Sequence, residues 1–423
     1  MSDKSLEEAA KTHLNALVDR NLIFVSQQGS NGNAKSYSIH DLLRDLCVRK
    51  ACEEKFLFIH RGAPHDLARS TSCLRRVCSH GPFSFEDAYI SPEQSCLARS
   101  LLLFSNTERR IPLSKFKLLR VLDLLHVRSM MFGKAILQLV NLRYLAVTIG
   151  KALPSSISRL CNLQTLIVQF GRRWFALVMK GAAICGIVDM SQLRHIKVTG
   201  RSYVRYHGER SGNHYVVLDK LQTLSPIAIS EISDRVLETL PNLEKLGIFL
   251  DEEVDDIRDL SRLHKLHSLK CISSKYDSGK LLSNLIFPPS IKKLTLWDCR
   301  ILDDHMNEIG KLPNLKVLKL RDCDFRSSKW EAEDGEFCQL QYLLMEHLNL
   351  VSWTADDTHF PRLEHLVIRR CGYLEEIPLA IGDIPTLKVI EVDQHSRSAA
   401  ASAREIQEAQ LDIGNDDLQV RIM

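Results

Sequence analysis

A glycine-rich stretch near the N-terminus comes close to a phosphate-binding loop. Residues 29–36 read GSNGNAKS, one position away from the pattern G-x-x-x-x-G-K-[ST], whose backbone N–H groups cradle nucleotide phosphates. Ala34 stands where the second glycine is required. Such a loop also runs directly from a buried strand into a helix, whereas here the polar Gln27 and Gln28 precede the stretch and the extended segment SYSI follows it. We therefore interpret residues 29–36 as an exposed hairpin turn.

Other residue types used in catalysis or metal binding lack the required spacing. Cys73, Cys78 and His80 lie close together in the sequence, but no second pair of ligands follows at the spacing of a zinc site. His264 and His267 form H-x-x-H rather than the H-E-x-x-H of zinc proteases, and no serine lies in a nucleophile elbow. We expect neither a catalytic site nor a metal site.

Composition argues against several classes of partner. The 423 residues carry 56 basic and 52 acidic side chains, and the net charge of +4 is too small for this length to indicate nucleic-acid binding. No run of 18 or more apolar residues occurs, and the start MSDKSLEEAAKTHL lacks the apolar core of a secretion signal. The 12 scattered cysteines favour reduced structural thiols over disulfides. We expect a cytoplasmic protein with no integral membrane segment, and leave peripheral attachment to membranes open.

The dominant pattern of the sequence is a repeat. Residues 291–323 contain two copies of apolar-x-x-Leu-x-Leu-x-x-Cys, IKKLTLWDC and LKVLKLRDC, and residues 363–371 contain a third, LEHLVIRRC. The alternating part of each copy predicts a short strand with one buried face. A strand this short buries that face only by stacking on the same strand of the next copy, as in a solenoid.

Thirteen positions along the chain match the start of this pattern. The steps between them run from 21 to 30 residues, and eleven of the twelve steps lie within the period of 20 to 29 residues that is typical of leucine-rich repeats. The sequence therefore predicts an α/β leucine-rich-repeat solenoid, with a curved parallel sheet of about 13 repeats, over residues 96–394. The thirteen positions are Ala98, Leu119, Leu142, Leu163, Leu193, Leu221, Leu243, Leu266, Ile291, Leu315, Leu340, Leu363 and Leu387.

The chain before the repeats predicts other elements. Residues 6–20 place apolar side chains at helical spacing, NLIFVS follows as a strand, and SYSIHDLLRDLCVRKACEEKF begins extended and continues as a helix. This order indicates the C-terminal part of a winged-helix domain over residues 1–56. We interpret residues 57–95, which are mixed in polarity, as a connector, and residues 395–423 as a C-terminal tail.

The repeat also predicts a binding surface. In each strand the x positions point away from the core, and stacked strands place them side by side on one concave sheet, which suits a macromolecule. The strip from Lys292 to Arg321, centred on Trp297, has the composition of a protein-binding hot spot for an acidic partner, with an ordinary solvated sheet face as the alternative. The residues expected on or beside this face include Arg143, Tyr144, Arg194, Lys197, Lys245, Lys292, Lys293, Trp297, Lys316, Lys319, Arg321, His365 and Arg369.

Two charged segments are predicted to lie in loops of the array. Residues 201–214 combine arginine, tyrosine and histidine with glycine, which fits a plain exposed loop, a protein contact or a nucleic-acid contact. Five of the residues 251–256 are acidic, and they follow the strand-like LGIFL, which indicates a solvated edge.

Several stretches carry a family resemblance. HLNALVDRNLIFVS followed by YSIHDLLRDLCVRKACEEKF resembles the winged-helix end of plant intracellular nucleotide-binding leucine-rich-repeat disease resistance proteins of the coiled-coil type. LARSLLLF, LPSSISRLCNLQTL and the tail SAAASAREIQEAQLDIGNDDLQVRI are similar to the late-blight-resistance-protein-like group. The resemblance covers nearly the whole chain as the C-terminal portion of such a protein, without the coiled-coil and nucleotide-binding segments expected upstream.

The resemblance implies a nucleotide contact that this chain does not complete. In the family a Met-His-Asp motif contacts the β-phosphate of ADP, and Ile39-His40-Asp41 occupies that place with Ile for Met. Full-length members bind ADP or ATP. Without a phosphate loop and its lysine, His40 offers a single hydrogen bond, and we expect no cofactor in this chain. Asp41 as an ordinary helix N-cap is the alternative interpretation.

The resemblance also implies partners. In the family the repeat surface restrains the nucleotide-binding core and, in many members, perceives a pathogen effector or a guarded host protein. These proteins are the expected partners, and nucleic acid is not. The alternatives are a free-standing repeat adaptor such as a ubiquitin-ligase substrate receptor, which would require an F-box-like start, and a non-signalling decoy.

Overall fold

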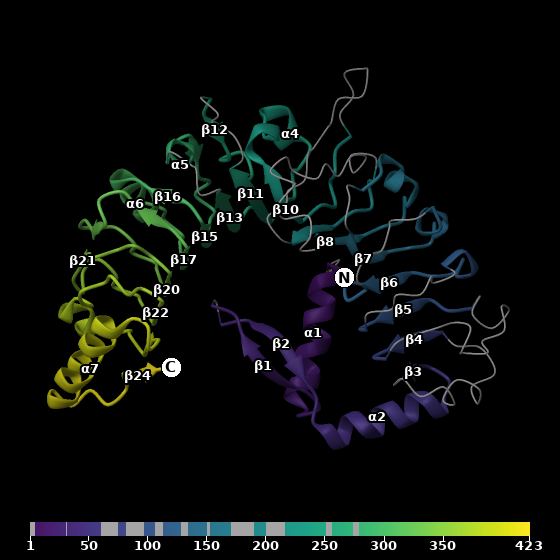
Figure 1. Ribbon diagram of the computed structural model, residues 1–423, viewed down its shortest axis with the longest axis horizontal. Coiled ribbons are helices and arrows are strands. Elements are labelled where there is room, and N and C mark those ends of the chain that lie inside the picture. Colours follow the sequence, from purple (N-terminus) through teal and green to yellow (C-terminus); the bar gives the residue numbers. More distant parts are fainter. Residues whose placement is uncertain are drawn as a thin grey trace.

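The computed structural model describes residues 5–30, 32–60, 75–81, 97–105, 113–127, 134–149, 153–170, 190–199, 216–250, 256–273 and 279–423. These residues form a curved solenoid whose inner side is a parallel sheet (Figure 1). The N-terminal segment lies inside the arc, close to the middle strands of that sheet. The fold therefore places the N-terminal segment against the concave face.

The inner sheet has 16 strands in the described part of the chain, and each strand pairs in parallel with the next one of the sheet. This order follows from a repeat in which every copy contributes one strand and returns on the outer side. The strands are β3 (Phe58–His60), β4 (Arg76–Ser79), β5 (Ser100–Leu103), β6 (Val121–Leu124), β7 (Tyr144–Ile149), β8 (Thr165–Phe170), β9 (His195–Thr199), β10 (Thr223–Ala228), β11 (Lys245–Leu250), β13 (Ser268–Ser273), β15 (Lys293–Trp297), β17 (Val317–Arg321), β20 (Tyr342–Glu346), β22 (His365–Arg369), β23 (Val389–Val392) and β24 (Gln419–Ile422).

The core runs along the whole solenoid behind this sheet. All thirteen predicted repeat starts are buried, and the most accessible of them, Leu387, is 5% exposed. Each repeat start precedes one strand of the inner sheet, and the two leucines of β17, Leu318 and Leu320, are also buried. Full burial of a leucine contributes roughly 1.5 to 3 kcal/mol, so the stacked repeats together overcome the weakness of each short strand. The predicted leucine-rich-repeat fold is confirmed.

Asparagine side chains tie successive repeats together. Asn141, Asn162, Asn242 and Asn314 each stand directly before a repeat-start leucine, and each Nδ2 donates to a backbone carbonyl of the preceding repeat over 2.7 to 2.9 Å. Turns between repeats leave carbonyl groups without a partner in the sheet, and these amides satisfy them. The same residue at the same place in four repeats therefore fixes their stacking.

The outer side of the solenoid is built from short and varied elements, which makes the array α/β. The helices are η2 (Leu113–Lys115), η3 (Ile136–Gln138), η4 (Ser155–Arg159), η7 (Ile229–Glu231), α4 (Asp234–Glu238), α5 (Lys280–Ser283), α6 (Asp303–Gly310) and η8 (Leu379–Asp383). The outer strand pairs are β12 (Arg258–Asp259) with β14 (Leu285–Ile286), β16 (Arg300–Ile301) with β18 (Asp324–Phe325), and β19 (Lys329–Glu331) with β21 (Ser352–Thr354). Beneath the last pair, Trp330 stacks on Trp353 with ring centroids 5.6 Å apart.

The repeat cysteines lie at the turn that follows their strands. Cys299, Cys323 and Cys371 are buried, and their thiols lie 3.4 Å from backbone carbonyls two residues earlier. Burial raises the pKa of Cys323 to about 12, so the thiol stays protonated. The residue before Cys323 is Asp322, at a φ of 51°, a left-handed conformation that aspartate adopts more readily than most residues. Every cysteine in the described ranges for which a state is given is a free thiol, as predicted.

The N-terminal segment has the predicted order of elements. Helix α1 (Leu6–Asp19) precedes an antiparallel hairpin of β1 (Phe24–Gln28) and β2 (Ala34–Ser38), and helix α2 (Asp41–Glu53) follows. The hairpin turn is closed by the N–H of Gly29, which donates to the carbonyl of Asn33 over 2.7 Å, and Gly32 has a φ of 72°. The stretch that resembled a phosphate loop is therefore a hairpin turn, as its flanking residues predicted.

The start of α2 corrects one interpretation. Asp41 is the first residue of the helix and His40 is its N-cap, because the His40 Nδ1 accepts from the N–H of Leu42 at 3.4 Å. A residue in extended conformation whose side chain accepts from the second helical N–H is an N-cap, and His40 has that geometry. Asp41 places its negative charge in the first turn, where the helix dipole favours it.

The sheet extends beyond residues 96–394 at both ends. Strands β3 and β4 begin it, and β24 pairs with β23 at the other end. Helix α7 (Arg397–Asp412) buries Ala399, Ala403 and Ile406 and covers the last repeat. No helix in the described ranges is both long and apolar enough to span a lipid bilayer.

Candidate protein-binding surface on the concave face

Strand register places the outward side chains of successive repeats next to one another. Lys270 of β13 is paired with Thr295 of β15, and Thr295 is paired with Lys319 of β17. Neighbouring strands lie about 4.8 Å apart, so the backbones of the two lysines are about 9.6 Å apart with the threonine between them. Lys293 and Trp297 lie on the same face of β15, two residues to either side of Thr295. Five outward residues of three strands thus form one group.

Aromatic rings hold the lysines of this group. The Nζ of Lys270 lies 4.2 Å from the ring centroid of Trp297, and the Nζ of Lys319 lies 4.8 Å from the ring centroid of Tyr342. The indole Nε1–H of Trp297 donates to Asp322 Oδ2 over 2.9 Å. Cation–π contacts at partly exposed sites contribute about 0.5 to 1 kcal/mol. Trp297 is therefore fixed in orientation by both contacts, as a preorganised anchor.

The same lysines are held in a poorly solvated and positively charged environment. Burial, with a smaller contribution from the charge of Arg321, lowers the pKa of Lys270 to about 8. Burial and then the charges of Lys293 and Arg321 lower the pKa of Lys319 to about 8. The pKa of Lys293 is also lowered, first by burial and then by nearby cations. A bound anion would reverse the charge repulsion.

Towards the C-terminal end of the sheet, the arginines of the concave face form ion pairs with carboxylates. The Nε of Arg321 lies 3.2 Å from Glu346 Oε2, an ion pair without the geometry of a hydrogen bond. Arg369 and Arg421 both contact Glu391, at 3.4 and 3.7 Å. Carboxylates on the next strand therefore neutralise both Arg321 and Arg369, which were expected among the residues on or beside this face.

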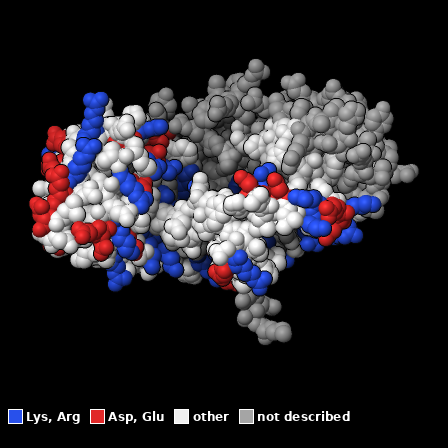
Figure 2. All heavy atoms as spheres, turned by 90° about the horizontal axis from the view of Figure 1, so that it is seen from below, with Lys and Arg blue, Asp and Glu red and all other residues white. Residues whose placement is uncertain are grey.

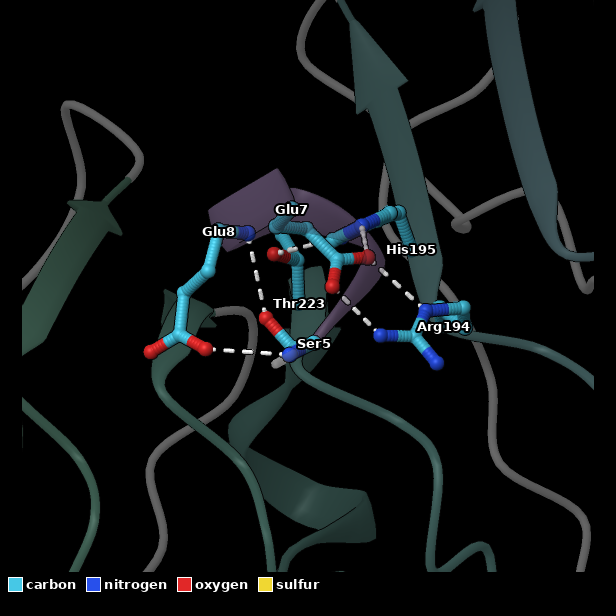
Figure 3. Close-up of polar contacts among 6 residues, drawn as sticks. All are labelled: Ser5, Glu7, Glu8, Arg194, His195 and Thr223. Carbon is cyan, nitrogen blue, oxygen red and sulfur yellow. Dashed lines mark hydrogen bonds and ion pairs between the residues drawn. The ribbon is translucent and has the colours of Figure 1, made fainter. Parts of the chain in front are cut away.

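Helix α1 occupies another part of the concave face (Figure 3). The carboxylate of Glu7 accepts from the Nε of Arg194 over 2.8 Å and also from its Nη2. The same carboxylate lies 3.2 Å from His195 Nε2, and His195 Nδ1 lies 3.1 Å from Thr223 Oγ1. The hydrogen bond from Arg194 lowers the pKa of Glu7 to about 2. Arg194, which was expected on or beside the concave face, is therefore paired with the N-terminal segment.

The N-cap geometry of α1 aims Glu7 at the sheet. Ser5 caps the helix: its hydroxyl accepts from the N–H of Glu8, while the Glu8 side chain accepts from the N–H of Ser5. This capping box fixes the first turn, and Glu7 lies in that turn. The helix N-terminus thus lies beside Arg194 and His195, the first residue of β9, as Figure 3 shows.

The remaining predicted residues occupy the rim or other parts of the face. Arg143, Lys292 and Lys316 are exposed and lie directly before their strands, at the rim of the sheet. Tyr144 of β7 is half-buried, Lys197 of β9 is exposed, and His365 of β22 stacks on Tyr342 with centroids 6.2 Å apart. Lys245 begins β11.

Two residues that contribute to the concave face, Lys270 and Glu7, were not predicted from the sequence. Lys270 stands between Leu269 and Cys271, in the predicted repeat that starts at Leu266, as Lys319 stands between two leucines, but it was not included among the predicted outward residues. Treating Cys271 as the apolar residue of the pattern would have placed Lys270 among them, because Cys271 is fully buried. Glu7 carries no signal of this kind, because its partner Arg194 is 187 residues away.

The other candidate sites stay apart from this face. Ile39 is half-buried, and His40 and Asp41 are exposed at the start of α2, where Asp41 Oδ1 lies 3.7 Å from Arg44. Cys78 Sγ lies 3.6 Å from His80 Nε2, and Cys73 is outside the described residues. Among the residues described, no three His, Cys, Asp or Glu side chains group as a metal site. Residues 201–214 and 251–255 also lie outside the described ranges.

Comparison with known proteins accounts for both parts of the chain. The family model of the disease resistance protein winged helix domain matches residues 1–47, and that of the leucine-rich repeat region matches residues 97–303. A late blight resistance protein homolog, R1B-16 of Solanum demissum, is 33% identical over 97% of this chain and 32% of its own length. Late blight resistance protein R1-A of the same species is 32% identical over 97% of this chain and 33% of its own.

The fold comparison and the chain lengths complete these findings. An internalin from Listeria monocytogenes aligns over 78% of this chain and 88% of its own, with a TM-score of 0.48 and 12% identity. This chain spans about a third of the length of the two Solanum relatives. Because nearly all of its residues align with those relatives and a resistance-type winged helix precedes the repeats, the chain belongs to the family of the late blight resistance proteins.

Proposed function

We propose that this chain acts in disease resistance as the recognition part of a receptor. Its concave face recognises a pathogen effector or a host protein, and it restrains a nucleotide-binding switch. The observation that carries the proposal is the group of Lys270, Trp297 and Lys319, in which aromatic rings hold cations on an open, curved surface. Large anchors with fixed orientation are typical of protein-binding hot spots.

The proposed restraint has a physical route in the contact of α1 with the array. Glu7 joins the winged-helix segment to Arg194 and His195 on the same sheet that carries the recognition group. A partner that binds the concave face changes the surroundings of this contact, and linkage makes the effect reciprocal. Docking of the N-terminal segment and partner binding are therefore coupled in this proposal.

The experiment is a pull-down of candidate effectors and host proteins with the whole chain. Trp297→Ala combined with Lys319→Glu removes the anchor and reverses one charge, and we expect partner recovery to fall at least tenfold, since a hot-spot residue contributes about 2 kcal/mol or more. Lys329→Glu on the outer strand β19 is the matched control and should leave recovery unchanged. Equal partner recovery with the double variant and with the unsubstituted chain would rule out the concave-face site.

We also propose that this chain by itself holds no nucleotide. His40 is an N-cap whose Nδ1 already accepts a backbone hydrogen bond, and the turn at residues 29–36 belongs to a hairpin. A nucleotide needs several charge-assisted contacts to its phosphates. Calorimetry with ADP should therefore detect no binding in the low-micromolar range, and a measured Kd in that range would contradict the proposal.

The alternative function is a free-standing repeat adaptor or a decoy that captures a partner without signalling. The winged-helix match over residues 1–47 favours the receptor, because an adaptor of the ubiquitin-ligase type would begin with an F-box-like helical segment. Co-purification of the chain with a ubiquitin-ligase scaffold, independent of Trp297 and Lys319, would favour the adaptor.

A further inference from the structure

The recognition group on β13, β15 and β17 has the form of a cradle for negative charge. Lys270 and Lys319 flank Thr295, whose side chain forms the floor between them and is 8% exposed. The ring of Trp297 lies under one ammonium group and the ring of Tyr342 under the other, so neither lysine is free to turn away into solvent. Lys293 adds a third cation next to the floor. The backbones of the two lysines are about 9.6 Å apart, and each ammonium group rests on an aromatic ring.

The three lysines of the cradle have no ion-pair partner within the described part of the chain. The arginines of the neighbouring strands pair with Glu346 and Glu391, while no described carboxylate lies within 4.0 Å of the ammonium groups of Lys270, Lys293 or Lys319. Three cations held together without a counter-charge repel one another and lose solvation. A ligand that brings carboxylates would remove this repulsion, and the surface is thus prepared for a partner that is itself acidic.

A further cation faces the cradle from the N-terminal segment. The hairpin of β1 and β2 extends into the hollow of the arc (Figure 1), and the charge of Lys35 on β2 acts on both Lys293 and Lys319. Figure 2, which looks towards the open side of the arc, shows Lys and Arg side chains inside this hollow. Like charges thus face each other across the space between hairpin and sheet. An anion between them would be attracted from both sides.

We propose that the hollow between the β1–β2 hairpin and strands β13 to β17 binds an acidic peptide segment of the partner in polyproline II conformation, with carboxylates at positions i and i+3 on Lys270 and Lys319 and with Lys35 on the other side of the segment. This inference rests on the proposed function and names the chemistry of the partner. In polyproline II, residues i and i+3 lie on the same side of the chain about 9.3 Å apart, which matches the separation of the two strands that carry the lysines. Two adjacent acidic residues point in different directions and do not reach both lysines.

The bound segment also changes how the N-terminal part sits on the array. Because its charges lie between Lys35 and the cradle, the ligand replaces repulsion by attraction across the hollow. Binding therefore strengthens the docking of the winged-helix segment on the concave face, and the Glu7 contact with Arg194 keeps that segment in place.

The test uses the whole chain and three fluorescein-labelled peptides in a fluorescence anisotropy titration at low salt. GSEAAEGS carries the proposed spacing, GSEEAAGS has adjacent carboxylates, and GSQAAQGS has none. We expect GSEAAEGS to bind at least about tenfold more tightly than the other two. Lys270→Gln and Lys319→Gln should each weaken this binding about tenfold, and Lys35→Gln about threefold. Lys329→Gln, the same change on the outer side, should leave it unchanged.

Equal binding of the three peptides, or an equal effect of Lys319→Gln and Lys329→Gln, would overturn the inference. Tighter binding of inorganic tripolyphosphate than of GSEAAEGS, abolished by the same substitutions, would also overturn it, because the ligand would then be a phosphate. Thermal unfolding of each variant verifies the fold, which matters most for the half-buried Lys270 and Lys319. The pull-down with the Trp297→Ala and Lys319→Glu double variant separates the two proposals. If this variant loses the partner but the three peptides bind equally, the acidic segment is refuted and the concave-face site stands.

Discussion

Residues of one type take different roles on this surface because of their neighbours. Arg321 and Arg369 are paired with carboxylates on the next strand, whereas Lys270 and Lys319 rest on aromatic rings and keep an unbalanced charge. Ion pairs at a surface contribute little to binding because their charges are already satisfied. The lysines are therefore the groups from which an acidic partner gains most.

The carboxylate of Glu7 predicts a pH dependence at the level of one residue. The hydrogen bond from Arg194 lowers its pKa from 4.5 to about 2 in the folded chain, so its contribution is present above pH 4.5 and is lost as the pH falls from 4.5 towards 2. Glu7→Gln should reduce the stability of the docked segment by about 1 kcal/mol at pH 7. Measured by hydrogen exchange of α1, the difference from the unsubstituted chain should shrink below pH 4.5.

The control for this experiment is Glu53→Gln, an exposed carboxylate at the end of α2 that pairs with Lys50 over 2.7 Å. Pairs of this kind at three residues' separation on a helix contribute a few tenths of a kcal/mol at most. A difference for Glu7→Gln that is no larger than that for Glu53→Gln, or that persists unchanged at pH 3, would show that the carboxylate does not hold the helix.

At the scale of elements, the strands of the solenoid can be predicted from the sequence because many copies share one pattern. A single strand such as β17 is too short to be identified with certainty, but thirteen strands in register share one pattern of buried positions, and all thirteen repeat starts are buried. The outer strands β16, β18, β19 and β21 left no such signal, because each has only two or three residues. The register of the inner sheet follows from the pattern, and with it the pairing of Thr295 with Lys319 on neighbouring strands.

Substitution in one strand should reveal how the repeats depend on each other. Leu318→Ala removes a fully buried side chain between two neighbouring repeats and should lower the free energy of unfolding by about 2 to 5 kcal/mol. Lys316→Ala, at the exposed position before the same strand, should change it by less than about 0.5 kcal/mol. Urea denaturation followed by circular dichroism measures both, and similar midpoints would contradict the assignment of Leu318 to the core.

At the scale of the whole molecule, the decisive feature is the placement of the N-terminal segment inside the arc. Periodicity predicts the array and the order of elements predicts the winged helix, but neither predicts their contact. The pairing of Glu7 with Arg194 joins residues 187 positions apart, and no local pattern distinguishes Glu7 from the other acidic residues of α1. Contacts of this kind depend on the curvature of the assembled solenoid, which the sequence of one repeat does not contain.

A charge reversal tests this placement. Glu7→Arg should release α1 from the sheet, because it brings a cation next to Arg194, and so should Arg194→Glu alone. The double variant restores opposite charges and should recover at least half of the lost protection of α1 in hydrogen exchange. Small-angle scattering should show the single variants to be more expanded than the double variant. If the losses of α1 protection in the two single variants simply add in the double variant, Glu7 and Arg194 do not form a direct pair.

The separation between Glu7 and its partner also affects how the molecule is made. A ribosome delivers the winged-helix segment first, and Arg194 emerges 187 residues later, so the helix waits in solution while the repeats are synthesised one by one. Until then the carboxylate of Glu7 lacks its partner on the sheet. Chaperones would therefore have the most time to bind this chain during the synthesis of its first nine strands, before the surface on which α1 docks has formed.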